Sequence, residues 1–123
     1  MNTIQELTML AFAAKAATTC GGLNLIDTIA GPQIFVRHGS DGVEEYKPWM
    51  PHKDKAQALE LAIELSLGMI VFLADEHSRA WTQDQSIGCV DVSHNDYSAE
   101  EATCRAITIA AAAMGEKMMS DQD

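Results

Sequence analysis

The chain has 123 residues, 47% of them apolar, which is enough to bury the core of one domain and too apolar for general disorder. Its formal net charge of −10 disfavours binding to nucleic acid or to anionic membrane, because both would repel it. No apolar run approaches the roughly 20 residues that span a bilayer, and no basic segment precedes an apolar one, so neither a membrane helix nor a signal peptide is expected. Three unpaired cysteines fit reduced thiols, and we expect a cytoplasmic protein.

A first helix is predicted over residues 3–18. Thr3 lies three residues before Glu6, the spacing of a capping box, in which each side chain bonds to the other residue's backbone amide. Gly21 and its neighbour supply the stop. Residues 23–29 are ambiguous between a short strand and a turn.

A β-hairpin and a second helix follow. A strand over 33–37 is joined through Asp41-Gly42 turn chemistry to a partner strand that ends at 46–49. The second helix is predicted over 55–66, where Asp54 serves as the cap three residues before a glutamine. Its apolar positions recur at helical spacing.

The run 69–73 is apolar at every position, which predicts a strand covered on both faces. Two further strands are predicted over 79–83 and 86–92. The third helix opens at Ser98, three residues before a glutamate, and is expected to reach about residue 114. Gly115 is its predicted stop, and residues 116–123 are expected to fray.

These elements predict a single α+β domain over 1–123, in the order α-β-β-α-β-β-β-α. We expect one antiparallel or mixed sheet of about four to five strands with helices on both faces, an α/β/α sandwich.

The sequence offers little chemistry. The segment 91–96 holds three potential metal ligands but lacks the glycine turn and the terminal acid of a calcium loop. Residues 38–41 contain His, Ser and Asp side by side, which a hairpin turn explains better than a triad. Zinc spacing and a phosphate-binding glycine loop are absent from the sequence. We therefore predict no catalytic residues, metal ligands or cofactor, and no enzymatic activity.

Acidic charge is concentrated in residues 56–104, where Arg79 is the one basic residue against nine acids, a net charge of −8. A dense acidic surface can occupy a basic groove on another protein and accelerate association. Tryptophan and tyrosine are favoured anchors in such interfaces. The predicted partner-binding residues are Asp75, Glu76, Trp81, Asp84, Asp91, Asp96, Tyr97, Glu100 and Glu101.

The segment Trp49-Met50-Pro51, followed by Asp54 and the helix residues 58–62, resembles a pattern in small phage and prophage proteins, the phage ABA-sandwich domain. The alanine-rich first and last helices fit the same pattern. Met50 stands where asparagine is common in that family. The resemblance implies a phage origin and an α/β/α sandwich. It carries over no site, since the family has no established catalytic residues.

A small acidic phage protein is expected to act by stoichiometric binding to a host protein with a basic surface, in the host cytosol. Our leading hypothesis is an inhibitor of a host defence complex, similar in role to an anti-CRISPR. One alternative is a domain that sequesters a small molecule or nucleotide, in a pocket that would use Arg37, Trp49 or Arg79. Another is a self-associating accessory protein of the phage particle, and the sequence leaves the oligomeric state open.

Overall fold

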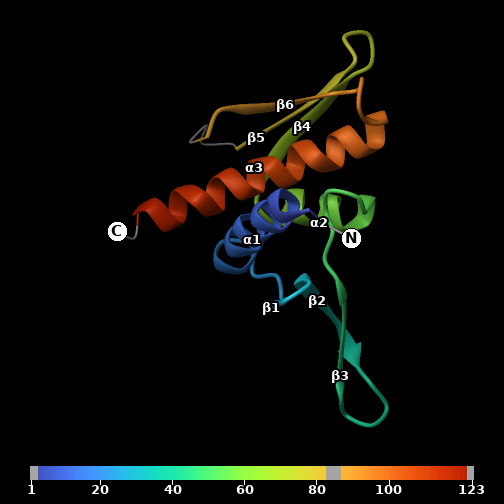
Figure 1. Cartoon of the computed structure of the whole chain (residues 1–123), viewed down its shortest axis with the longest axis vertical. Coiled ribbons are helices and arrows are strands. Elements are labelled where there is room, and N and C mark those ends of the chain that lie inside the picture. Colours follow the sequence, from blue (N-terminus) through green and yellow to red (C-terminus); the bar gives the residue numbers. More distant parts are fainter. Residues whose placement is uncertain (1–2, 83–86, 122–123) are drawn as a thin grey trace.

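A computed structural model describes residues 3–82 and 87–121 of the chain (Figure 1). The fold is α+β. The elements in chain order are α1 (Ile4–Thr19), β1 (Leu25–Thr28), β2 (Gly31–His38), β3 (Glu44–Pro48), α2 (Lys55–Glu64), β4 (Leu67–Phe72), β5 (His77–Thr82), β6 (Cys89–Ser93) and α3 (Ala99–Asp121).

The strands form two separate antiparallel sheets, in the orders β1-β2-β3 and β4-β5-β6. The prediction of one sheet with four to five strands is therefore wrong. The ambiguous segment 23–29 contains the additional strand β1, so that each of the first two helices is followed by three strands. Each strand pairs with its neighbour in sequence, which is the simplest arrangement for strands joined by short turns.

The layers are also the reverse of the predicted sandwich (Figure 1). Helix α3 lies along the β4–β6 sheet, and α1 packs on α3 from the other side. The β1–β3 sheet contacts α1, and its β2–β3 hairpin extends away from the rest of the molecule. The helices thus occupy the interior and the two sheets lie outside them.

The contact between α1 and α3 is made by small side chains, which let the two backbones approach closely. A Cβ atom added to Gly115 would lie 1.8 Å from the carbonyl oxygen of Phe12. Gly115 is therefore a packing residue inside α3, and the prediction that it stops the helix is wrong. The helix continues to Asp121, so residues 116–121, expected to fray, are helical. The buried alanines of this layer are Ala13, Ala14, Ala16, Ala17, Ala102, Ala106, Ala110 and Ala111.

All three predicted helix starts are confirmed. In each case the side-chain oxygen of the cap accepts a hydrogen bond from the backbone amide three residues on, which satisfies one of the free amides of the first turn. The bonds are Thr3 to Glu6 at 3.1 Å, Asp54 to Gln57 at 3.0 Å and Ser98 to Glu101 at 3.1 Å.

The apolar run at 69–73 forms most of β4, but it is not buried on both sides. Met69, Ile70 and Val71 are 42%, 43% and 41% exposed. The reason is topological, because β4 is an edge strand and α3 covers one face of its sheet only. The central strand β5 instead alternates, with Ser78 and Ala80 buried and their neighbours partly exposed.

Candidate functional site

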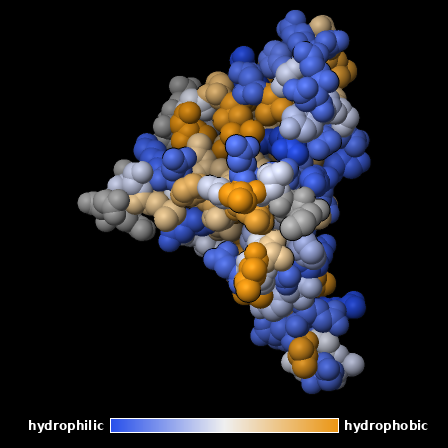
Figure 2. All heavy atoms as spheres, in the orientation of Figure 1, coloured by the Kyte–Doolittle hydropathy of each residue, from blue (hydrophilic) through white to orange (hydrophobic). Residues whose placement is uncertain are grey.

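The turn between β4 and β5 touches the loop between β6 and α3. The backbone amide of His94 donates to the carbonyl oxygen of Glu76 at 2.7 Å. This contact joins the turn that carries Asp75 and Glu76 to the loop that carries Asp96, at one end of the β4–β6 sheet, and all three side chains are exposed. Among the described residues none of the three has an ion-pair partner. We call Asp75, Glu76 and Asp96 the acidic tip; Figure 2 shows the hydrophilic end of the molecule around the β4–β5 turn.

Asp91, Glu100 and Glu101 differ from the acidic tip, because basic side chains face them. Asp84 lies outside the described residues. Asp91 raises the pKa of Arg79 through a hydrogen bond and its negative charge. Such pairs reduce the negative charge that a partner would meet. They are Arg79–Asp91 at 2.9 Å, His77–Asp91 at 3.4 Å, Lys55–Glu100 at 3.3 Å and Arg105–Glu101 at 3.6 Å.

The two predicted aromatic anchors do not join the acidic tip. The indole of Trp81 covers Gly68 of the neighbouring strand, where an added Cβ would lie 2.3 Å from the ring. The guanidinium of Arg105 lies over the ring of Tyr97, 4.3 Å from the ring centroid, in a cation–π contact within the molecule. Of the nine predicted residues, the structure therefore groups three at one place.

A polar network behind the acidic tip links β5, the β6–α3 loop and α3. The Ser78 hydroxyl, fully buried, lies 2.9 Å from Nε2 of His94 and 2.8 Å from the Thr103 hydroxyl. Thr103 in turn donates to the carbonyl oxygen of Ala99 at 2.7 Å. The sequence analysis missed this network. The alternation along 77–82 carries the signal, since it turns Ser78 inward with Ala80.

The protons of this network can be assigned from its chemistry. Thr103 has one hydroxyl proton and gives it to a carbonyl, so it can only accept from Ser78. Ser78 has then used its own proton and accepts from Nε2–H of His94. In this arrangement His94 is a donor to the serine and does not withdraw its proton. The network holds the loop of the acidic tip onto α3, and it does not have the base that activates a nucleophilic serine.

A buried histidine anchors the segment after β3. His52 is fully buried, and its Nε2 lies 3.1 Å from Oε2 of Glu6 on α1. Burial lowers the pKa of His52, and the hydrogen bond to Glu6 opposes that shift only in part. Neutral His52 therefore donates to the carboxylate. Glu6 completes no capping box with Thr3, because its side chain serves this longer-range contact instead.

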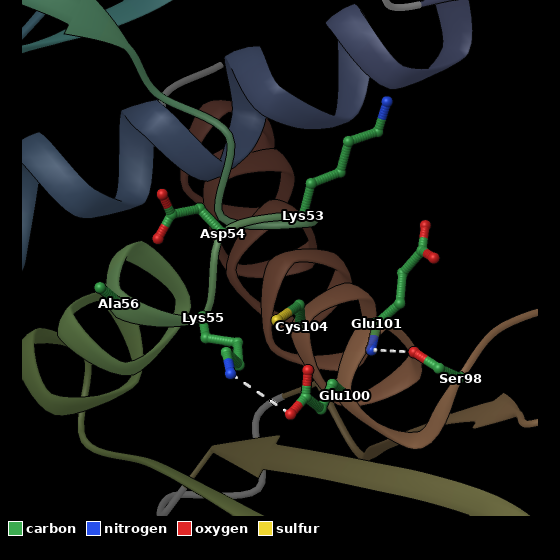
Figure 3. A pocket seen from close by; sticks show the side chains of 8 residues that line it. All are labelled: Lys53, Asp54, Lys55, Ala56, Ser98, Glu100, Glu101 and Cys104. Atoms are coloured by element: carbon green, nitrogen blue, oxygen red, sulfur yellow. Dashed lines mark hydrogen bonds and ion pairs between the residues drawn. The ribbon is translucent and has the colours of Figure 1, made fainter.

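A hollow of about 640 Å³ lies between the starts of α2 and α3 (Figure 3). Lys53 and Lys55 line it, but so do Asp54 and the glutamates at 100 and 101. Lys55 points toward Glu100, and both helix starts already hold their own caps. An anion would meet carboxylates there, so the charges do not favour a phosphate ligand. Cys104 also lines the hollow, and burial raises its pKa, which disfavours the reactive thiolate.

The residues proposed for a nucleotide pocket do not converge. Arg37 on β2 pairs with Glu45 at 2.7 Å, while Arg79 lies on the other sheet. Trp49 is fully buried in the core. In the ranges 3–82 and 87–121, no group of three or more His, Cys, Asp or Glu side chains is placed to hold a metal ion.

The segment 38–41 spans the last residue of β2 and the start of the β2–β3 turn. Gly42 has a φ of +84°, and the Asp41 carboxylate accepts from the amide of Val43 at 3.0 Å. This turn explains the adjacency of His, Ser and Asp in the sequence.

Among the helices described, none is both long and apolar enough to cross a membrane. Comparison of the chain with protein-family models, with curated proteins and with solved structures found no match.

Proposed function

We propose that this chain is a small phage-type accessory protein that binds a host protein stoichiometrically and inhibits a host defence complex, in the manner of an anti-CRISPR. The observation that supports this proposal is the acidic tip. Its carboxylates are exposed and without basic partners in the described chain, whereas Asp91, Glu100 and Glu101 face bases. A partner with a basic groove, of the kind that holds nucleic acid, would meet concentrated negative charge there.

The acidic tip also has a firm support. The hydrogen bond from His94 to Glu76 joins its two loops, and the Ser78 network ties the second loop to α3. A rigid display of charge favours binding, since little motion is lost on association. The nucleotide-sequestering alternative lacks comparable support, because its candidate residues lie apart. A melting temperature raised by a nucleotide would revive it.

The test compares two double variants that change the net charge equally. Asp75→Lys with Asp96→Lys alters the acidic tip, and Asp27→Lys with Glu116→Lys alters exposed acids elsewhere. The wild type is used to capture a partner from lysate of a bacterial host with a nucleic-acid-targeting defence system, and both variants are then compared with it. Association rates with the captured partner are then measured at about 50 mM and about 500 mM salt, since the two concentrations screen charges very differently.

We expect the tip variant to associate at least ~10-fold more slowly than the wild type at low salt, and the control to stay close to wild type. At high salt, the association rate of the wild type should fall close to that of the tip variant. Protection of phage from the defence system should fall with the tip variant only. Equal behaviour of the two variants, or association indifferent to salt, would remove the electrostatic basis of the proposal.

A further inference from the structure

The outer edge of β4 is open. In the β4-β5-β6 sheet, β4 pairs with β5 in an unbroken register from Leu67 to Phe72, and no described strand lies on its other side. Monomeric proteins usually protect such an edge with a charge, a proline or a bulge. Here residues 65–74 contain neither a charged residue nor a proline, in a chain whose net charge is −10.

Both faces of β4 offer apolar side chains beside this edge. Ile70, on the face away from the helices, is 43% exposed. Met69 and Val71, on the other face, line an almost wholly apolar groove of about 360 Å³ together with Leu59 of α2. Ile63 extends the apolar surface along α2 and is 66% exposed.

We propose that β4 pairs antiparallel with β4 of a second copy, which joins the two sheets into one six-stranded sheet across a two-fold axis. A two-fold axis places residue i of one copy opposite j of the other and j opposite i. Opposite residues must point to the same face of the sheet, and neighbours along a strand point to opposite faces, so i and j differ by an even number. The axis must therefore pass beside a residue, and an axis at Ile70 pairs residues 68–72 of β4 with the same residues of the second copy. Met69 then lies opposite Val71 of the second copy.

The exposed area supports a second copy as the occupant. The chain exposes 7223 Å². A compact monomer of its 13.3 kDa mass is expected to expose roughly 6,500 Å². Part of this excess lies in the projecting β2–β3 hairpin, and part lies beside β4, where Met69, Ile70, Val71 and Leu73 are 42%, 43%, 41% and 71% exposed. Each partner of a stable protein–protein interface buries roughly 800 Å².

The positions of the acidic side chains support the antiparallel arrangement. Helix α2 packs beside β4, with Glu60 and Glu64 in its second half. A two-fold axis at β4 also reverses α2, so these glutamates lie toward opposite ends of the dimer, where they repel each other less than in a parallel arrangement. The same axis sends the two acidic tips to opposite ends of the dimer, where they repel each other least.

The first test is the mass in solution, measured by size exclusion with light scattering at about 50 µM, where interfaces of this size associate. We expect twice the 13.3 kDa chain mass for the wild type. Val71→Lys should raise the dimer dissociation constant by at least ~100-fold, because it buries a charge in the interface. Val43→Lys, at a 62% exposed position of the β2–β3 hairpin, is the matched control and should stay dimeric.

Circular dichroism shows whether Val71→Lys is folded; if it is not, Leu73→Lys, at a position 71% exposed, replaces it. The second test is cross-linking with a short bismaleimide in a Cys20→Ser, Cys89→Ser background. Ile70→Cys should cross-link to its own copy, and Val36→Cys on β2 should not. A monomeric wild type, an open-ended assembly, a folded Lys variant that stays dimeric, or equal cross-linking at both positions would overturn the proposal.

Discussion

The two sheets have the same size and the same strand order, yet they are anchored very differently. In the β4–β6 sheet, every strand lies against α3, and Ser78, Ala80, Thr82 and Val92 are buried beneath the helix. In the β1–β3 sheet, Pro32 is the one buried strand residue among those described, and the hairpin beyond it extends into solvent (Figure 1). Contact with the helical layer, rather than strand pairing, therefore decides how strongly a sheet shares the stability of the core.

The largest expected effect comes from the helical layer that both sheets share. Gly115→Ala places a methyl group against the Phe12 carbonyl and should lower the free energy of unfolding by about 3 kcal/mol or more, with both sheets losing hydrogen-exchange protection. Urea unfolding measures the loss. Ser120→Ala, exposed on the same helix, is the control. An ordinary helical glycine gains roughly 1 kcal/mol from this change, so a stabilised Gly115→Ala variant would contradict the close contact.

A smaller loss of stability is expected from a substitution that weakens the contact of one sheet only with the helices. Ser78→Ala leaves Thr103 and His94 without their buried partner and should destabilise the protein by about 1–3 kcal/mol. Hydrogen exchange should show the loss in β5 and β6 before β2 and β3. Ser40→Ala, at an exposed position of the β2–β3 turn, should change stability by no more than about 0.5 kcal/mol. If the two serine variants are equally stable, the network does not hold the sheet to α3.

The smallest effect depends on pH and concerns His52, which anchors the segment after β3 to α1. Because burial lowers the pKa of His52, the unfolded chain takes up a proton before the folded one. The resulting stability is complete above the unfolded value of 6.5 and is lost as the pH falls below it. Urea midpoints between about pH 8 and about pH 5.5 should show this loss. His52→Gln should be less pH-dependent than the wild type, while His38→Gln, at an exposed position, should match the wild type.

Local features of the fold were predictable from the sequence, because their chemistry lies within a few residues. The three helix caps need a side-chain oxygen and an amide three positions away, and the β2–β3 turn needs Asp41-Gly42. Gly115 was misread for the opposite reason. Its role is set by Phe12, about a hundred residues earlier, and a glycine near the end of a helical pattern looks the same in either role.

The arrangement of the strands was not predictable for a similar reason. An apolar run such as 69–73 fits a strand between two layers and also an edge strand with a bare face, and the pattern does not separate them. The sequence showed that acidic residues are concentrated in the segment that contains the candidate site. Their division into a free group at Asp75, Glu76 and Asp96 and a neutralised group required the positions of Lys55, Arg79 and Arg105.

The hydrogen bond between the His94 amide and the Glu76 carbonyl has a consequence for the loops that it joins. Two surface turns that would otherwise sample many relative positions move as one unit. The bond joins one main chain to the other, so rotation of a side chain does not break it. Sequence changes within either turn should therefore be felt in the other. Grafting the β4–β5 turn onto another hairpin would transfer its residues without their geometry.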